Sequence, residues 1–257
     1  MKFVSQVFKS YPAMFAGENS SPPFIHWAQM KVVRCESLVN CVNISRMWTN
    51  KAAGTGNMVT EIIERQMTRL FDQRTKYNEL EMLAALQAYL LYSMMLFFEY
   101  CSPKSFVEQD AMIKLQGLAG DVARTGTVCL AETRDTRPDW ESWIVASAKR
   151  RTLFVASMFD NLVNFTLGTP SFIATELAEL PAPASKRLWE SSNRNSWNMA
   201  YNQHLTEWIE APFLVSELWP VADMNSARRQ QRLGQWLSNV DEFGMMIYSV
   251  TAHTYGG

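Results

Sequence analysis

The chain has few residues of the kinds that hold metal ions. It contains four cysteines, and the two closest in sequence, Cys35 and Cys41, are six residues apart. The three histidines, His26, His204 and His253, are widely separated. Structural zinc sites use pairs of ligands about two to four residues apart, because one turn then directs both at the ion. The sequence therefore predicts no metal site and favours free thiols in a reducing compartment.

An excess of positive charge is also missing. The chain has 24 basic and 25 acidic residues, a formal net charge of −1, and a predicted isoelectric point of about 6.3. Proteins that bind nucleic acids gain much of their affinity by neutralising phosphates and releasing counterions. This balance therefore predicts that the chain does not bind nucleic acid directly.

The common catalytic motifs are absent as well. The sequence has no glycine-rich dinucleotide or phosphate-binding loop, no Gly-x-Ser-x-Gly nucleophile turn and no His-Glu-x-x-His metal helix. We therefore expect no cofactor. A cofactor-independent reaction needs only orientation and one or two hydrogen bonds in a shaped cavity, so these absences do not exclude it.

What the chain does have is helical periodicity. Apolar residues recur along one face of segments 59–71 and 233–251, whereas alternating apolar and polar positions are rarely sustained. Glycine and proline residues divide the rest into segments of helical length. The sequence predicts an all-α fold, a single domain over residues 1–257 in which about eight to eleven helices form a bundle around a buried central helix at 82–98.

Segment 82–98 is almost wholly apolar, but its length and flanks do not suit a membrane span. Its 17 residues would cover about 25 Å as a helix, just short of a bilayer core. Acidic residues flank it, and no basic loop is present to orient insertion. Near the N-terminus, Lys9 interrupts any apolar run before it is long enough for a secretory signal. We expect an intracellular protein of the nucleus or cytoplasm, with no membrane span.

Three polar side chains interrupt this central segment. Gln87 lies within it, and burying its amide without partners would cost about 1–3 kcal/mol. Tyr89 and Tyr92 carry hydroxyl groups on the same helix. The three side chains form either a buried hydrogen-bond network or the polar groups of an internal pocket.

Segment 140–164 also carries polar groups on an otherwise apolar helix. Arg151, Asp160, Asn161 and Asn164 either belong to a structural scaffold or line a cavity at the centre of the bundle. In a cavity, a buried arginine could polarise a carbonyl group and a desolvated aspartate could accept a proton. We expect a ligand pocket between the two long helices, with one end closed by the aromatic neighbours His26 and Trp27.

A second histidine lies on an amphipathic segment with large aromatic residues. His204 is accompanied there by Trp197, Tyr201 and Trp208. A lone histidine on a helix is more often a core or surface residue than a catalytic base. The predicted pocket therefore does not include His204.

Three arginines mark the beginning of the last predicted helix. Arg228, Arg229 and Arg232 lie in its first turns, where positive charge opposes the helix dipole. They form either an exposed basic turn or a surface that faces an acidic partner.

The order and spacing of several motifs resemble a known family. The motifs in the second half of the chain are Trp140 and Trp143, the basic run 149–151, Phe159 and Asp160, Gly168 and Pro170, the segment 180–183, and Trp189. The motifs nearer the N-terminus are the segments 10–12, 22–26 and 43–48. Together they resemble the regulatory, or middle homology, region of fungal binuclear zinc-cluster transcription factors. The six-cysteine cluster with which those proteins bind DNA has no counterpart in this sequence.

The resemblance implies a helical regulatory module and leaves two functions open. The first is a stand-alone module that binds a hydrophobic small molecule or a protein partner, without DNA binding of its own. It includes a regulatory fragment whose DNA-binding half lies elsewhere. The second is a cofactor-independent cyclase or isomerase of secondary metabolism, which would act on a hydrophobic fungal natural product in an aromatic-lined cavity. The richness in aromatic residues and methionine suits either function.

Overall fold

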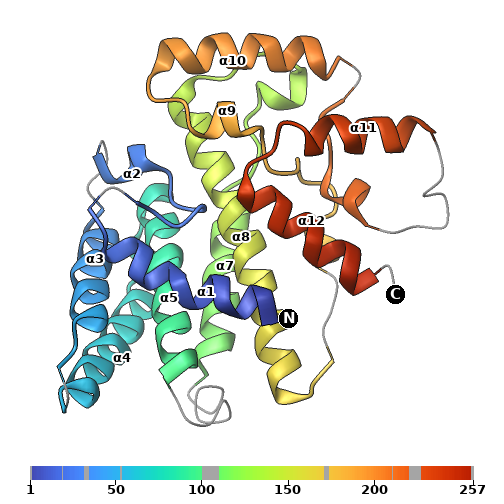
Figure 1. Ribbon diagram of the computed structural model, residues 1–257. Helices are drawn as coiled ribbons and strands as arrows, with labels where there is room; N and C mark the ends of the chain where they lie inside the picture. The colour runs from blue at the N-terminus through green and yellow to red at the C-terminus, as the bar shows by residue number, and fades with distance from the viewer. Residues whose placement is uncertain are drawn as a thin grey trace. The chain divides into compact units, whose positions relative to one another are not determined.

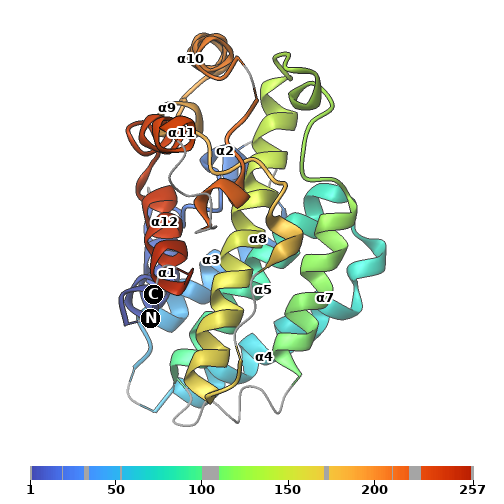
Figure 2. The ribbon, with the colours of Figure 1, turned by 90° about the vertical axis from the view of Figure 1, so that its right-hand side faces the viewer.

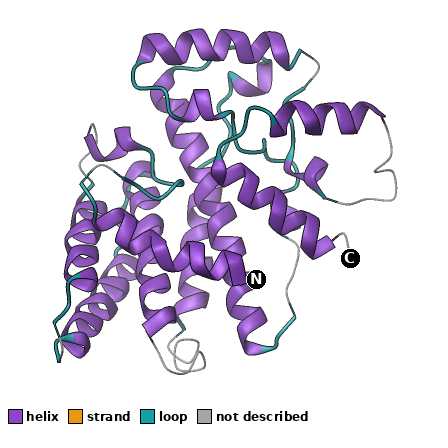
Figure 3. Cartoon of the chain, viewed as in Figure 1, coloured by secondary structure: helices purple, strands orange, loops and turns teal. Residues whose placement is uncertain are grey.

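The computed structural model describes residues 2–18, 20–31, 35–52, 54–99, 110–170, 174–209, 211–219 and 227–255. Within these ranges the chain forms eleven α-helices and four 3-10 helices, and it has no strand (Figure 3). Two isolated bridges, Pro181 with Leu214 and Ser185 with Val240, are its only β-type pairings there. The predicted all-α fold is confirmed.

The chain folds into two compact units. The first unit comprises residues 1–125 and 151–172, and the second comprises 126–150 and 173–257. The helix α8 (Trp140–Leu167) crosses from one to the other between Arg150 and Arg151. Because one helix contributes to both units, the predicted single domain over 1–257 stays a prediction.

The first unit is built around the helix α5 (Glu79–Glu99), which both views draw among its neighbours (Figures 1 and 2). Helices α1, α3, α4 and α7 contact it along its length. The other helical elements of this unit are α1 (Lys2–Ala16), α2 (Trp27–Lys31), α3 (Glu36–Thr49), α4 (Gly56–Asp72), η1 (Arg74–Lys76), α7 (Ala111–Arg124) and the second half of α8.

The sequence of α5 accounts for its central position. Asn78 begins the helix by accepting hydrogen bonds from the amides of Leu80 and Glu81, both at 3.0 Å, and the Glu81 carboxylate accepts in turn from the Asn78 amide. Every residue from 82 to 97 is buried. The helix is long and apolar enough to cross a membrane, but 89% of its most apolar window is buried inside the protein. These features are those of the central helix that the sequence predicts.

The second unit combines short helices with extended connections. Asn193 begins α10 by accepting from the Ser196 amide at 2.9 Å, and α10 contacts α9. The elements of this unit are η2 (Glu132–Arg134), the first turns of α8, η3 (Thr175–Leu177), α9 (Lys186–Trp189), α10 (Arg194–Glu207), η4 (Val215–Leu218), α11 (Ala227–Leu237) and α12 (Glu242–Tyr255).

The single helix predicted from the stripe over 233–251 is wrong. The structure has two helices there, α11 and α12, separated by residues 238–241. The Asp241 carboxylate accepts a hydrogen bond from the Gly244 amide at 3.0 Å and so begins a new helix. The carbonyl of Asn239 accepts from the Lys186 amide at 2.8 Å. In one continuous helix these groups would bond to other residues of the helix, whereas here they bind Lys186 and begin α12.

Candidate functional site

The first unit satisfies the amide of Gln87 with protein atoms. Its Nε2 donates to the carbonyl of Phe24 at 2.8 Å and lies 3.2 Å from the hydroxyl of Thr152. The side chain of Gln29 donates to the Oε1 of Gln87 at 3.2 Å. His26 joins this group, because its backbone amide donates to Gln29 at 2.9 Å. The Gln87 amide is thus accounted for without a ligand.

The two tyrosines of α5 have separate surroundings. The Tyr89 hydroxyl donates to the carbonyl of Ala111, on α7, at 3.2 Å. Tyr92 interacts with Cys41 of α3, and burial, followed by this thiol, raises the pKa of the Tyr92 hydroxyl far above its ordinary value. Burial likewise raises the pKa of the Cys41 thiol to about 12. Both tyrosines and this thiol are therefore neutral at physiological pH.

The polar residues in the second half of α8 are also held by neighbours. Buried Arg151 donates to the carbonyl of Pro23 at 3.1 Å. Half-buried Asp160 accepts from Gln116 at 2.9 Å and from Asn164 at 3.1 Å. Asn161 is half-buried beside them in the same helix.

The structure therefore brings the predicted residues together only in part. His26 and Gln87 are joined through Gln29, and Asp160 and Asn164 form a pair. The ring of His26 lies against that of Trp27, with centroids 5.4 Å apart, while its Nδ1 accepts from the backbone amide of Ala28 at 3.2 Å. That the nine residues line one ligand pocket stays a prediction.

A pocket of about 370 Å³ lies within the second unit. Its walls come from η2, the first turns of α8, α10, α11 and the connections that include residues 179–185 and 211–214. Five large aromatic side chains contribute to the walls: Trp143, Tyr201, Trp208, Phe213 and Trp236.

The helix α10 supplies one face of this pocket. Tyr201 and His204 lie three residues apart on one side of the helix, Trp208 directly follows its last residue, and all three line the pocket. Trp197 precedes them by one turn and packs against Tyr201, with ring centroids 4.8 Å apart. This aromatic row holds the imidazole of His204, whose ring centroid lies 5.4 Å from that of Tyr201.

Two extended connections form another wall. The amide of Ala182 donates to the carbonyl of Phe213 at 2.8 Å. The indole of Trp236, on α11, donates to the carbonyl of Pro183 at 2.9 Å. The rings of Phe213 and Trp236 stack at 5.4 Å. Backbone pairing and ring stacking thus fix this wall without a sheet.

A buried ion pair forms the polar part of the pocket. Arg150 binds Glu132 through both carboxylate oxygens, at 3.0 and 3.2 Å, and the two side chains are 5% and 11% exposed. Arg150 also donates to the carbonyl of Thr127 at 2.8 Å and to the hydroxyl of Ser147 at 3.1 Å. The pair is bidentate and further hydrogen-bonded, which is the arrangement a buried charge pair needs.

The imidazole of His204 is kept neutral in this pocket. Burial lowers its pKa below the ordinary value, and Arg150 acts in the same direction, while Glu207 and Glu132 oppose the shift. A neutral imidazole can accept a proton or a hydrogen bond from a bound molecule. Burial, followed by Glu132, raises the pKa of the nearby Cys129 thiol to about 12, so this thiol is protonated.

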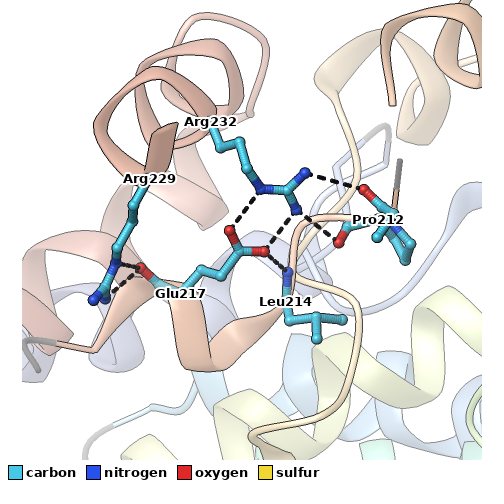
Figure 4. A network of polar contacts seen from close by, with 6 residues as sticks. Pro212, Leu214, Glu217, Arg229 and Arg232 are labelled. Atoms are coloured by element: carbon cyan, nitrogen blue, oxygen red, sulfur yellow. Dashed lines mark hydrogen bonds and ion pairs between the residues drawn. The ribbon is translucent and has the colours of Figure 1, made fainter. Parts of the chain in front are cut away.

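Two arginines of α11 bind the segment that includes Pro212 and Glu217 (Figure 4). Arg232 binds the carboxylate of Glu217 with two contacts of 2.7 Å and donates to the carbonyl of Pro212 at 3.0 Å. Arg229 donates to the backbone carbonyls of Glu217 and Trp219. Arg232 of the predicted basic turn thus pairs with an acidic side chain of the same chain, whereas Arg229 donates to backbone carbonyls.

The environment of Glu217 keeps it ionised. Its burial favours a higher pKa, but the hydrogen bonds from Arg232 and from the Leu214 amide outweigh burial and hold the pKa below the ordinary value. Pro212 and Leu214 both line the pocket. Arg232 donates directly to the Pro212 carbonyl, and it binds the Glu217 carboxylate, which accepts a hydrogen bond from the Leu214 amide. These contacts of Arg232 therefore position part of the pocket wall.

The sequence contains one local signal for this pocket. The spacing of Trp197, Tyr201, His204 and Trp208 places one histidine within an aromatic row on one helix face. The contributions of Glu132 and Arg150 could not have been recognised in this way, because they are 18 residues apart and belong to different elements.

Among the residues that the structure describes, no group of three or more His, Cys, Asp or Glu side chains is placed to hold a metal ion.

Residues 81–214 match the model of a family described as the fungal specific transcription factor domain. The match begins in α5 and includes the whole of α8 and α10, and it covers just over half of the chain. No curated protein and no solved structure matches the chain.

Proposed function

The chain belongs to the fungal specific transcription factor domain family, and we propose that it acts as a regulatory module that binds a hydrophobic small molecule in the pocket of the second unit. The resemblance seen in the sequence and the family match support the regulatory role. The pocket supports the choice of a small molecule as the effector.

The observation that carries this proposal is the size and lining of the pocket. Its volume, about 370 Å³, falls in the range of roughly 300–1,000 Å³ that is common for ligand sites. Five aromatic side chains supply apolar area, and His204 with the Glu132–Arg150 pair supplies a few fixed polar groups. Apolar walls with few polar groups fit a hydrophobic molecule, which would gain about 25 cal/mol for each Å² of apolar surface it buries there.

We further propose that the chain does not itself bind DNA with sequence specificity. Its acidic and basic residues nearly balance, and its sequence contains no six-cysteine cluster. Without a basic surface, the release of counterions from DNA would contribute little affinity. A gel-shift titration at physiological salt should show no duplex bound more tightly than scrambled competitors.

Small-molecule binding can be tested with a neutral aromatic probe, 1-pyrenemethanol. The probe is equilibrated across a dialysis membrane with the protein on one side, and the pyrene absorbance on the two sides reports binding. At about 0.3 kcal/mol per non-hydrogen atom, we expect a Kd on the order of 0.1 mM or lower. Ala184→Trp places an indole in the pocket wall and should weaken binding at least tenfold.

The matched control is Ala227→Trp. Ala227 is exposed on α11 and does not line the pocket, so this variant carries the same added ring outside the site. It should bind the probe as the unchanged protein does. Equal weakening in both variants, or binding that neither variant alters, would contradict the proposed site. Absence of any binding would contradict the proposed function.

A further inference from the structure

The charges that line the pocket are unequal once the buried pair is set aside. Among the described residues of the lining, Arg150 is the only lysine or arginine, and it is paired with Glu132. Three more carboxylates, those of Asp135, Glu179 and Glu207, line the pocket and are exposed at its rim. The rim thus carries formal negative charge with no cation of the lining left to balance it.

The end of α10 adds to this negative character. The helix ends at Glu207, and His204, Leu205 and Glu207 of its last turn line the pocket. The C-terminus of a helix carries a partial negative charge of about half an electron. A cation at this rim would meet both the carboxylates and the favourable end of the helix dipole.

The aromatic walls suit a cation as well. The faces of tryptophan and tyrosine rings attract positive charge, and they do so most strongly where water is excluded. The wall already shows this contact on its outer side, where the Arg232 guanidinium lies 5.2 Å from the ring centroid of Trp208 and 5.8 Å from that of Phe213. Trp143 and Tyr201 also line the pocket.

From the rim charge, the helix end and the ring faces together, we propose that the ligand is an apolar molecule that carries a positively charged nitrogen. Its apolar body lies among the aromatic walls, and its cationic group lies at the rim near Asp135, Glu179 and Glu207. This inference rests on the proposed function, because it names the chemical class of ligand for the same pocket. An anionic ligand would meet three carboxylates and an arginine that is already paired.

The test compares three pyrene probes that differ in charge. These are 1-pyrenemethylamine, which is cationic at pH 7, the neutral 1-pyrenemethanol, and anionic 1-pyrenecarboxylic acid. Exposed ion pairs are individually weak, so three of them should favour the amine over the alcohol by about tenfold. The acid should bind more weakly than the alcohol. Raising the salt concentration to about 1 M should reduce the preference, because it screens exposed charges.

A triple variant locates the preference at the rim. Asp135→Asn, Glu179→Gln and Glu207→Gln together should bring the Kd of the amine to that of the alcohol, so the ratio of the two dissociation constants should fall to about one. The control variant is Glu141→Gln, Glu176→Gln and Glu190→Gln, which removes the same charge from exposed positions of the second unit outside the pocket. This control should retain the preference for the amine.

The outcomes separate this inference from the proposed function. If the alcohol binds but the amine has no advantage, or if the acid binds best, the ligand class is wrong and the small-molecule site stands. If the control removes the preference as fully as the rim variant does, the effect comes from net charge and the rim site is wrong. If none of the probes binds, the inference and the proposed function fail together.

Discussion

In the first unit, the polar side chains of the long helices donate to neighbouring protein atoms. In the second unit, comparable polar side chains line a pocket. Gln87 and Arg151 bond to the backbone carbonyls of Phe24 and Pro23. Glu132 and Arg150 also bond to each other, but together with His204 they line a pocket of about 370 Å³. Both units contain buried polar groups, and in the second unit some of these groups line a pocket.

The difference has a structural cause. The first unit packs regular helices against a helix that is buried from 82 to 97, so side chains interdigitate and polar groups find partners on adjacent helices. In the second unit, extended connections with Pro181 and Pro183 stand between short helices and large aromatic rings. Rigid rings and proline backbones cannot adapt their shape to fill every space. The second unit therefore leaves the space in which we propose that a ligand binds.

The largest effect should follow from breaking the ion pair of the second unit. Arg150→Met leaves the Glu132 carboxylate, 11% exposed, without its guanidinium partner. Removing one member of a buried pair costs about 3–5 kcal/mol, because the other charge stays buried and uncompensated. Urea denaturation followed by circular dichroism measures the loss in free energy of unfolding.

The double variant Arg150→Met, Glu132→Leu tests this cause. Replacing both charges removes the uncompensated carboxylate and should recover at least half of the lost stability. Arg194→Met is the surface control, because Arg194 pairs with Glu141 where both side chains are exposed. Arg194→Met should leave the urea concentration at the midpoint of unfolding unchanged. A double variant that is as unstable as the single one would show that lost packing, rather than charge, is responsible.

A tryptophan introduced into each unit compares their packing directly. Ala88, on α5, is fully buried, and an indole there should cost about 3 kcal/mol or more, because the core must be overpacked. Ala184→Trp in the second unit should cost less than about 1 kcal/mol, because the pocket provides room. Thermal unfolding of the two variants gives the comparison. Equal losses of stability would contradict the distinction between close packing around Ala88 and open space beside Ala184.

The hydrogen-bond network of the first unit should show a smaller effect. Gln87→Leu keeps an apolar side chain of similar size but leaves the Phe24 carbonyl and the Gln29 amide without this partner. The expected cost is about 2 kcal/mol. Gln87→Glu, which keeps the shape and changes the hydrogen-bonding atoms, should also be destabilising. Urea denaturation that detects no change in either variant would show that this network contributes nothing to stability.

Much of the first unit could be predicted from the sequence, because its signals are local. The apolar run 82–98 became α5, the stripe over 59–71 became α4, and segment 140–164 became most of α8. Gln87 was correctly identified as a buried amide that needs partners. Its partners, however, come from residues 24, 29 and 152, which no local pattern connects to α5.

The second unit was predicted less well, because its structure depends on interactions between distant segments. The apolar stripe over 233–251 continues across residues 238–241, where the structure has no helix. Val240 forms a β-bridge with Ser185, and Asp241 begins the next helix. The pocket combines η2, α8, α10 and α11 with residues around 180 and 212. Only the aromatic row of α10 was visible as a periodic pattern, and a lone histidine within it gave no reason to prefer a site over a core.

The smallest effect should be a pH dependence that originates in His204. Its pKa is lowered in the folded protein, chiefly by burial, so the unfolded chain binds the proton more readily than the folded one. The imidazole therefore contributes stability above its unfolded pKa of about 6.5, and that contribution is lost as the pH falls toward the folded pKa. Between pH 8 and pH 5.5, the Tm of the unchanged protein should fall more than that of His204→Gln. In the first unit no such dependence is expected from Gln87, since an amide does not titrate, and Gln87→Leu should lower the Tm equally at both pH values. Parallel curves for the unchanged protein and His204→Gln would show that the pocket does not hold this imidazole neutral.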